Sequence, residues 1–188
     1  MKKILILLFL ITGIAVYFMV QNKDLFLNKT EQVLTKNQFF FKSVKGKEFV
    51  VHGVNKRFKI KGIKNKIVFL KVFGWNCNFC QKEIPELIKL KEEFSNAFDV
   101  IAIESQKHTN RENLEKIDKH GINYHIISGE NQEDFFEYLK KEYNWMGIIP
   151  LTIIVGEDGQ VLAFEEGFKS YSLAGLLKMA LIERKKNK

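Results

Sequence analysis

The segment most informative about the fold is residues 66–87, which read KIVFLKVFGWNCNFCQKEIPEL. Its first part, Ile67–Phe73, is almost continuously apolar, a pattern typical of a strand buried on both faces of a parallel sheet. From Phe79 to about Phe94, apolar residues recur at helical spacing, so a helix is predicted to follow. A buried strand that leads directly into a helix indicates an α/β fold, and both cysteines lie at the junction.

Cys77 and Cys80 are separated by two residues. In a first helical turn, positions i and i+3 are close enough for a disulfide bond. Unpaired backbone N–H groups and the macrodipole at a helix N-terminus favour a thiolate on the first sulfur. Cys77 is thus placed to attack a disulfide and Cys80 to resolve the product.

Two other interpretations of the cysteine pair stay open. A zinc site needs four ligands, commonly including a second cysteine or histidine pair. His120 and His125 have a suitable spacing, but residues 121–124 between them resemble a helix end entering a strand. The two thiols could instead be inert and buried. His52 and His108 are interpreted as solvated strand or loop residues, so no histidine is required for catalysis.

The remaining sequence alternates strand-like and helix-like segments. Strands are predicted at Phe39–Val44, Glu48–His52, Arg57–Ile60, Phe98–Ile103, Tyr124–Ile127, Leu151–Val155 and Gln160–Phe164, and helices at Asn110–Lys119, Asn131–Lys141 and Ser172–Ile182. The first two strands flank a turn at residues 45–47 and form an added N-terminal β-hairpin. The order predicts an α/β sandwich around a mixed sheet.

The first 22 residues predict a membrane anchor. Lys2 and Lys3 precede an uncharged, mostly apolar stretch, Ile4–Val20, which as a helix would reach about 25 Å and could cross a bilayer. Bulky residues end this stretch, whereas a cleavable signal peptide needs small ones; cleavage at an unusual site is the alternative. We expect a single-pass signal anchor in the cytoplasmic membrane at residues 1–22, a linker at 23–36 and a domain at 37–188 facing the periplasm or cell exterior.

Composition excludes several classes of protein. Hydrophobic residues make up 46% of the chain, enough for a real core, which argues against disorder. The net charge of +8 would suit an anionic partner, but among the 30 Lys and Arg residues only Arg57, Arg111 and Arg184 are arginine, the residue best suited to phosphates and bases. We expect no nucleic-acid binding, and at most weak attraction to an anionic membrane surface.

Three motifs together resemble the TlpA/ResA/CcmG-type thioredoxin-like family. They are Gly74–Leu87, Gly147–Thr152 and Gly156–Val161. The resemblance covers about residues 39–182 and implies a thioredoxin fold, a central mixed sheet flanked by helices. It also implies that Cys77 is the exposed nucleophile and Cys80 the buried resolving thiol of a redox-active disulfide.

The same resemblance assigns roles to further residues. Glu83, one turn after Cys80, matches an acidic residue that could accept the Cys80 proton and, while ionised, oppose thiolate formation on Cys77; the alternative is an ordinary solvated glutamate. Pro85 matches a helix-kinking proline. Pro150 matches a cis-proline that faces the disulfide, where the Ile149 backbone would pair with a substrate strand. Judged from sequence alone, trans is the default for this bond.

The sequence departs from the family pattern in three places. Asn76 immediately precedes the first cysteine where the family has tryptophan, and Trp75 comes one residue earlier. The residues between the cysteines are Asn78 and Phe79, without the common proline. The approach to the cis-proline, residues 143–150, is about one residue longer. These differences bear on the substrate surface and on the redox potential.

We expect a substrate-binding surface of Trp75, Asn78, Phe79, Ile149 and Pro150. Trp75 and Trp145 either line an apolar groove around the disulfide or pack in the core. The catalytic residues predicted by resemblance are Cys77, Cys80 and Glu83.

The resemblance implies a membrane-anchored extracytoplasmic thiol-disulfide oxidoreductase. We expect a monomer, for which a membrane tether is sufficient, and no metal or cofactor. The usual direction in this family is the reduction of protein disulfides, often those of apocytochrome c before haem attachment, with electrons from a membrane thiol carrier of the CcdA or DsbD type. One alternative is a disulfide-forming oxidase or isomerase of the same fold. The other is a non-enzymatic copper or zinc binding module.

Overall fold

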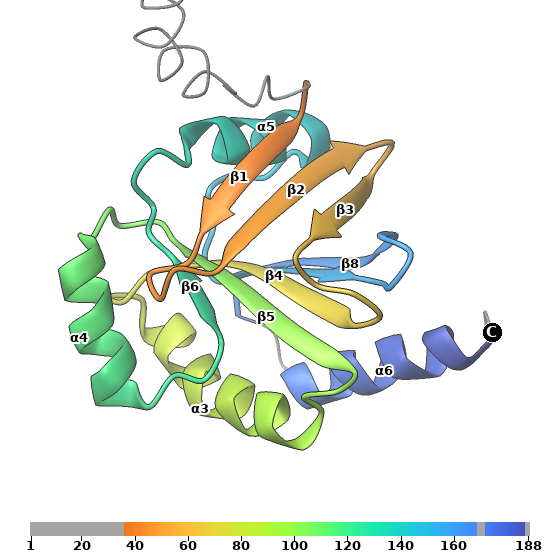
Figure 1. The fold of residues 1–188 in the computed structure, drawn as a ribbon. Coiled ribbons are helices and arrows are strands. Elements are labelled where there is room, and N and C mark those ends of the chain that lie inside the picture. Colours follow the sequence, from red (N-terminus) through yellow and green to blue (C-terminus); the bar gives the residue numbers. More distant parts are fainter. Residues whose placement is uncertain (1–35, 169–171, 187–188) are drawn as a thin grey trace, which may run out of the picture. The chain divides into compact units, whose positions relative to one another are not determined.

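The computed structural model describes residues 36–168 and 172–186 of the 188-residue chain. The predicted anchor at residues 1–22, and the predicted linker except for its last residue, lie outside the described residues. Within the two described ranges, no helix combines the length and the apolar character needed to cross a membrane. Figure 1 shows how the described elements are arranged.

Five strands form the central sheet, in the order β6-β5-β4-β7-β8. Their bounds are β4 Ile67–Phe73, β5 Phe98–Glu104, β6 His125–Ile127, β7 Leu151–Val155 and β8 Val161–Glu166. The neighbours β4, β5 and β6 run parallel, whereas β7 is antiparallel to both β4 and β8. Every residue of β4 and β5 is buried. The predicted mixed sheet, with its central strand buried on both faces, is confirmed.

Four helices accompany this sheet: α3 Asn78–Glu93, α4 Asn110–His120, α5 Glu133–Tyr143 and α6 Leu173–Lys186. The helix α3 follows the central strand and buries a stripe at helical spacing, made of Cys80, Ile84, Leu87 and Leu90. This stripe packs in one hydrophobic cluster with β4 residues such as Phe69 and with Leu177 of α6. The predicted elements are all present, with ends that differ by a few residues.

Local chemistry sets the helix ends. Thr109 caps α4 in a reciprocal capping box with Glu112, and Gly121 ends the helix in the left-handed conformation at φ 64°. Ser172 directly precedes α6, and its Oγ accepts a hydrogen bond from the Gly175 N–H at 3.1 Å, as an N-cap side chain does. Pro85 lies inside α3, as predicted.

The N-terminal addition is larger than the predicted hairpin. Its strands β1 Gln38–Lys42, β2 Glu48–Val54 and β3 Arg57–Lys61 form an antiparallel three-stranded sheet, because the third predicted strand pairs with β2. Inward-facing phenylalanines pack against α5, with the Phe41 and Phe135 ring centroids 5.1 Å apart. In Figure 1 this sheet and α5 lie across the central sheet from α3 and α6.

Both ends of the small sheet are tied to the central sheet. The Val44 N–H donates to the Ile126 carbonyl at 2.9 Å, and the Phe58 N–H donates to the Gly159 carbonyl at 2.8 Å. Gly159 has φ +84°, and a Cβ there would lie only 2.7 Å from the Phe58 oxygen. A residue other than glycine would therefore strain this junction.

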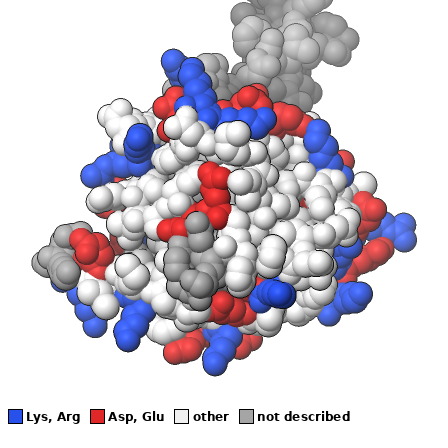
Figure 2. All heavy atoms as spheres, turned by 180° about the vertical axis from the view of Figure 1, so that it is seen from behind, with Lys and Arg blue, Asp and Glu red and all other residues white. Residues whose placement is uncertain are grey.

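The positive charge is not gathered into one patch on the face that Figure 2 shows. That face has a broad uncharged area with a few acidic side chains near its middle, and lysine and arginine lie around its rim. This distribution differs from the continuous basic stripe typical of nucleic-acid binding.

Candidate active site

The two cysteines lie at the start of α3, as predicted. Cys77 is the N-cap residue, and its Sγ accepts a hydrogen bond from the Cys80 N–H at 3.2 Å. A disulfide joins the two residues, whose Cα atoms are 5.2 Å apart. Cys80 is 2% exposed, whereas Cys77 is partly exposed. Cys77 is therefore the sulfur that a partner can reach, at a position where helix N–H groups stabilise a thiolate.

The loop before β7 faces this disulfide. The Ile149–Pro150 peptide bond is cis, as the family resemblance implied, and the Ile149 carbonyl oxygen lies 3.9 Å from Cys77 Sγ. The Trp145 indole Nε1–H donates to the Ile148 carbonyl at 2.9 Å, and the Gly167 N–H donates to the Pro150 carbonyl at 2.8 Å. These bonds hold the backbone of Ile149 and Pro150 beside the attacking cysteine.

Both tryptophans are core residues, which favours packing over the groove interpretation. Trp75 is 3% exposed and Trp145 is 5% exposed. The Trp75 indole donates to Asn113 Oδ1 at 2.8 Å, so α4 satisfies its polar atom in the core. The expectation that Trp75 contacts substrate is not supported, because almost none of its surface is accessible.

The exposed aromatic surface beside the cysteines comes from other residues. Phe79, which was predicted to bind substrate, is 45% exposed, and Phe168 is 57% exposed. Their rings stack at a centroid distance of 4.9 Å, with Lys82 Nζ 5.4 Å from the Phe79 ring. Asn78 is also exposed. Sequence analysis missed Phe168, because it follows β8 and no periodic signal joins it to the cysteine loop.

The cis-proline loop adds further exposed apolar side chains. Met146 is 81% exposed and Ile148 is 50% exposed. Together with Phe79 and Phe168 they are referred to below as the apolar rim. Large exposed hydrophobic side chains close together mark binding surfaces more often than isolated ones do.

Glu83 is not an ordinary solvated residue. Its Oε2 lies 3.0 Å from the Lys71 Nζ, and the Glu83 side chain is only 17% exposed. Lys71, which sequence analysis did not single out, is 1% exposed in the middle of β4. The signal for it was a lysine within an otherwise apolar strand, a position that requires a buried partner.

Lys71 has a second partner in the adjacent strand. Its Nζ donates a hydrogen bond to Thr152 Oγ1, and Thr152 is its Cα partner in the β4–β7 register. Burial lowers the pKa of Lys71 below its ordinary value, and the nearby Glu83 carboxylate opposes this shift in part. Lys71, Glu83 and Thr152 are called the Lys71 cluster below.

A residue that follows β5 supports the loop before Cys77. Gln106 Oε1 accepts a hydrogen bond from the Asn76 N–H at 2.9 Å. A Cβ at Gly74 would lie 2.7 Å from the Gln106 side chain, so glycine permits this close approach. The loop before Cys77 is thereby held against the segment that follows β5.

Within the described residues, no group of three or more His, Cys, Asp and Glu side chains is placed to hold a metal ion. The two histidines considered for zinc have different surroundings. His120 stacks on Trp75 with ring centroids 5.9 Å apart, whereas His125 Nε2 lies 3.6 Å from Asp99 Oδ1.

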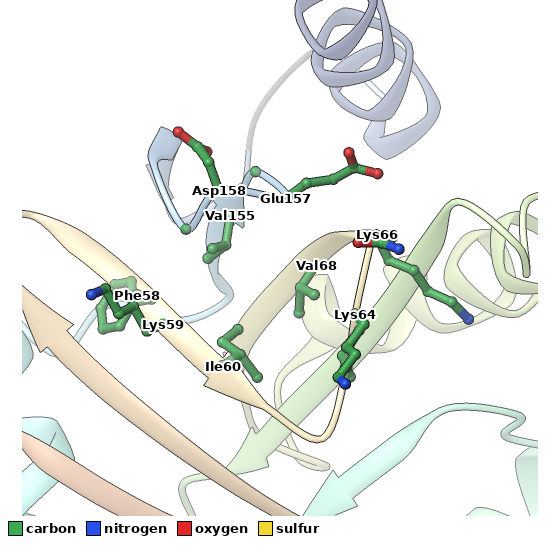
Figure 3. A pocket seen from close by; sticks show the side chains of 13 residues that line it. Phe58, Lys59, Ile60, Lys64, Lys66, Val68, Val155, Glu157 and Asp158 are labelled. Atoms are coloured by element: carbon green, nitrogen blue, oxygen red, sulfur yellow. The ribbon is translucent and has the colours of Figure 1, made fainter. Parts of the chain in front are cut away.

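A pocket of about 360 Å³ lies away from the cysteines, near the beginning of β4. Figure 3 shows the apolar side chains of Phe58, Ile60, Val68 and Val155 around it, with Lys64 and Lys66 at one side. Val68 pairs with Val155 in the β4–β7 register, whereas the cysteines follow the other end of β4. The pocket therefore does not belong to the cysteine site.

Comparison with known proteins agrees with this geometry. A family model described as the AhpC/TSA family matches residues 41–164. The thiol-disulfide oxidoreductases ResA of Bacillus anthracis and of Bacillus thuringiensis (strain Al Hakam) are each 25% identical over 122 residues, which cover 62% of this chain and 66% of each relative. The aligned region thus spans slightly less than two thirds of the relatives' length.

Solved structures show the same fold. StoA from Bacillus subtilis matches with a TM-score of 0.53 and 18% identity, over 77% of this chain and 97% of that chain. A putative thioredoxin from Neisseria meningitidis matches with a TM-score of 0.59 and 15% identity, over 80% and 89% of the two chains. These similarities confirm the predicted thioredoxin-like fold and the resemblance to ResA-type proteins.

Proposed function

This chain belongs to the AhpC/TSA family, and on that premise we propose that it is a thiol-disulfide oxidoreductase that reduces protein disulfides outside the cytoplasm. The observation that supports the activity best is the Cys77–Cys80 disulfide at the N-terminus of α3, facing cis-Pro150. The curated relatives named for this activity support it as well.

The mechanism follows from the unequal exposure of the two sulfurs. In the reduced chain, the Cys77 thiolate attacks one sulfur of a client disulfide, and the other client sulfur leaves as a thiolate that takes up a proton. Cys80 then loses its proton and attacks Cys77 Sγ. The second client thiolate departs, and the Cys77–Cys80 disulfide remains. The client gains two electrons and two protons, and the cysteine pair loses them.

The apolar rim suggests how a client is held. Met146 and Ile148 on the loop before cis-Pro150, with Phe79 and Phe168, offer exposed apolar area suited to apolar residues beside a client cysteine. The backbone of Ile149 lies close enough to Cys77 to pair with an extended client segment. A client with an unfolded or flexible cysteine segment fits this surface better than a rigid one.

Location, direction and partners complete the proposal. The apolar stretch Ile4–Val20 after Lys2 and Lys3 supports a single membrane anchor with the catalytic domain outside the cytoplasmic membrane. A reductase in that compartment needs electrons from a membrane thiol carrier, of the CcdA or DsbD type by family resemblance. The cysteines of apocytochrome c are the client class that the same resemblance suggests.

The decisive experiment replaces the resolving cysteine in the full chain. Cys80→Ser should accumulate mixed disulfides with client proteins through Cys77, because the second step is blocked, and reducing agent should release them. The matched control is the double variant Cys77→Ser/Cys80→Ser, which should trap nothing. If Cys80→Ser traps no client in membranes where the chain is expressed, exchange catalysis is contradicted.

The direction of electron flow has its own measurement. Equilibrating the Cys77/Cys80 pair in graded thiol-disulfide buffers gives its reduction potential. A value near or below about −230 mV supports a reductase, whereas a value near about −120 mV supports the disulfide-forming oxidase considered from sequence.

A further inference from the structure

Lys71 is a buried ammonium in the central strand. It is 1% exposed, and the other six residues of β4 are apolar and buried. Placing a charge in an apolar interior carries a large free-energy cost unless a counter-charge is close. A counter-charge must therefore lie close to the Lys71 ammonium.

The counter-charge comes from the helix that carries the cysteines. Glu83 follows Cys80 by one turn of α3, and its Oε2 lies 3.0 Å from Lys71 Nζ. Cys80 packs in the same hydrophobic cluster as Phe69 and Phe73. These two β4 residues lie two positions before and after Lys71, so they share its face of the sheet. Lys71 thus extends from the sheet toward the turn of α3 that holds the resolving cysteine.

Solvent can reach this cluster through a small pocket. A space of about 90 Å³ is lined by Glu83 and Thr152, with Glu165 and Phe168 on its other sides. Among the described residues, no hydrogen-bond donor is aligned with Glu83 Oε2, whose polar contact is the ion pair. The Glu83 side chain is 17% exposed and lines this pocket, so its carboxylate can exchange a proton with water there.

We infer that Lys71 is a positioning residue for the resolving step, because its ammonium holds Glu83 as a carboxylate beside the Cys80 turn. The inference deepens the proposed function and rests on it. When the mixed disulfide at Cys77 resolves, Glu83 accepts the Cys80 proton while Cys80 Sγ forms a bond to Cys77 Sγ. The bond from Cys77 Sγ to the client sulfur breaks, the client thiolate leaves with the electron pair, and the proton passes from Glu83 to solvent.

Several titratable or charged groups face Glu83. They are Lys71 of β4, Lys82 and Glu86 of α3, Tyr124 just before β6 and Glu165 of β8. Glu86 Oε1 accepts a hydrogen bond from the Ala174 N–H at 2.9 Å, so it is bound to the start of α6. Lys71 is the cation that forms an ion pair with Glu83.

The resolving step can be timed with an aromatic disulfide probe. Reduced full-length chain in detergent is mixed with 5,5′-dithiobis(2-nitrobenzoate), and Cys77 becomes a mixed disulfide with release of one coloured thiolate. Cys80 then displaces the second, so the second absorbance phase measures resolution. This leaving group departs as a thiolate, so the pH dependence of the phase reports proton removal from Cys80.

Lys71→Met should slow the second phase about tenfold at pH 7 and move the midpoint of its pH profile upward by about one unit, because Glu83 loses the ammonium that holds its carboxylate in place to take the Cys80 proton. The first phase should change by less than about twofold. The double variant Lys71→Met/Glu83→Gln removes both charges and should fold even if the single variant does not. Its second phase should stay slow.

Lys91→Met is the matched control. It removes one lysine from a buried ion pair on the same helix, 3.1 Å from Asp99, and should leave the pH profile unchanged. A wild-type rate in the double variant would overturn the inference, since Lys71 would then only neutralise Glu83. An unchanged pH profile in a folded Lys71→Met chain would also overturn it. Absence of the second phase in the wild-type chain would instead contradict the proposed function.

Discussion

Two buried charged clusters lie toward opposite ends of the central sheet, and they differ in how many partners hold the central charge. Asp99, near the beginning of β5, is within 3.1 Å of Lys91, 3.6 Å of His125 and 3.8 Å of Lys66. These four residues are called the Asp99 cluster below. In the Lys71 cluster, which lies toward the cysteines, the ammonium has one carboxylate partner at contact distance.

This difference in the number of counter-charges distinguishes Asp99, a structural charge, from Lys71, a charge suited to a role in the reaction. Burial by itself would raise the pKa of Asp99, but hydrogen bonds from His125 and Lys91 and the positive charge of Lys91 outweigh it and hold the pKa well below its usual value. Burial dominates at Lys71 and lowers its pKa. A charge held by several counter-charges keeps one protonation state, whereas a charge with one counter-charge responds when that group changes.

The largest effect is expected from Glu83→Gln, which removes the carboxylate of the Lys71 cluster. Breaking a buried pair from one side leaves an uncompensated charge, so the free energy of unfolding should fall by about 3 kcal/mol at pH 7. Because the pKa of Lys71 is lowered from 10.5, the unfolded chain binds more protons in the window below pH 10.5, and stability rises with pH there. Glu83→Gln removes a group that opposes the lowering of the Lys71 pKa, so the pH range in which stability rises with pH should extend to lower values.

Urea denaturation of the oxidised chain at several pH values measures this prediction. Glu92→Gln, on the exposed side of the same helix, is the matched control and should change the free energy of unfolding by less than about 0.5 kcal/mol. A loss below about 1 kcal/mol without pH dependence would show that Lys71 does not depend on Glu83.

Asp99→Asn should have a somewhat smaller effect, about 2 kcal/mol at pH 7, because Lys66, Lys91 and His125 keep some contact with water after the carboxylate is lost. The lowered pKa of Asp99 means that its contribution is complete above pH 3.8 and is lost as the pH falls below that value. The variant should therefore show a flatter acid limb in thermal unfolding curves.

The activity of Asp99→Asn also tests whether the two clusters have different roles. Since the Asp99 cluster is proposed to be structural, resolution of the Cys77 mixed disulfide should keep its wild-type pH profile in Asp99→Asn. A shifted profile would mean that the two clusters are coupled through the sheet, and the distinction between them would fail.

The sequence predicted those parts of the site that depend on local pattern. The apolar run of β4, the helical period of α3 and the spacing of Cys77 and Cys80 all lie within one continuous segment, so periodicity was sufficient. The cis-proline and the acidic residue came from motif resemblance. The first of these is present in the structure, and the role of Glu83 stays a prediction.

What the sequence did not predict depends on contacts between distant segments. Lys71 could be identified as unusual, but an apolar run buried on both faces does not show which helix a given side chain meets. The indole N–H of buried Trp75 is satisfied by Asn113, which lies 38 residues later in the sequence. Phe168 stacks on Phe79 although no local pattern relates them. Pairings of this kind require the tertiary structure.

The smallest effect is expected from Thr152→Val, which removes the oxygen that accepts the Lys71 hydrogen bond and keeps the shape of the side chain. Glu83 still balances the charge, so the free energy of unfolding should fall by only about 1 kcal/mol. In Lys71→Met the same substitution should cost less, because the donor is already absent and the two changes are not additive. Thr152→Ser keeps the hydroxyl and should retain the hydrogen bond. Equal losses for Thr152→Val in both backgrounds, measured by urea denaturation, would show that Thr152 acts independently of Lys71, and the Lys71 cluster would reduce to the ion pair.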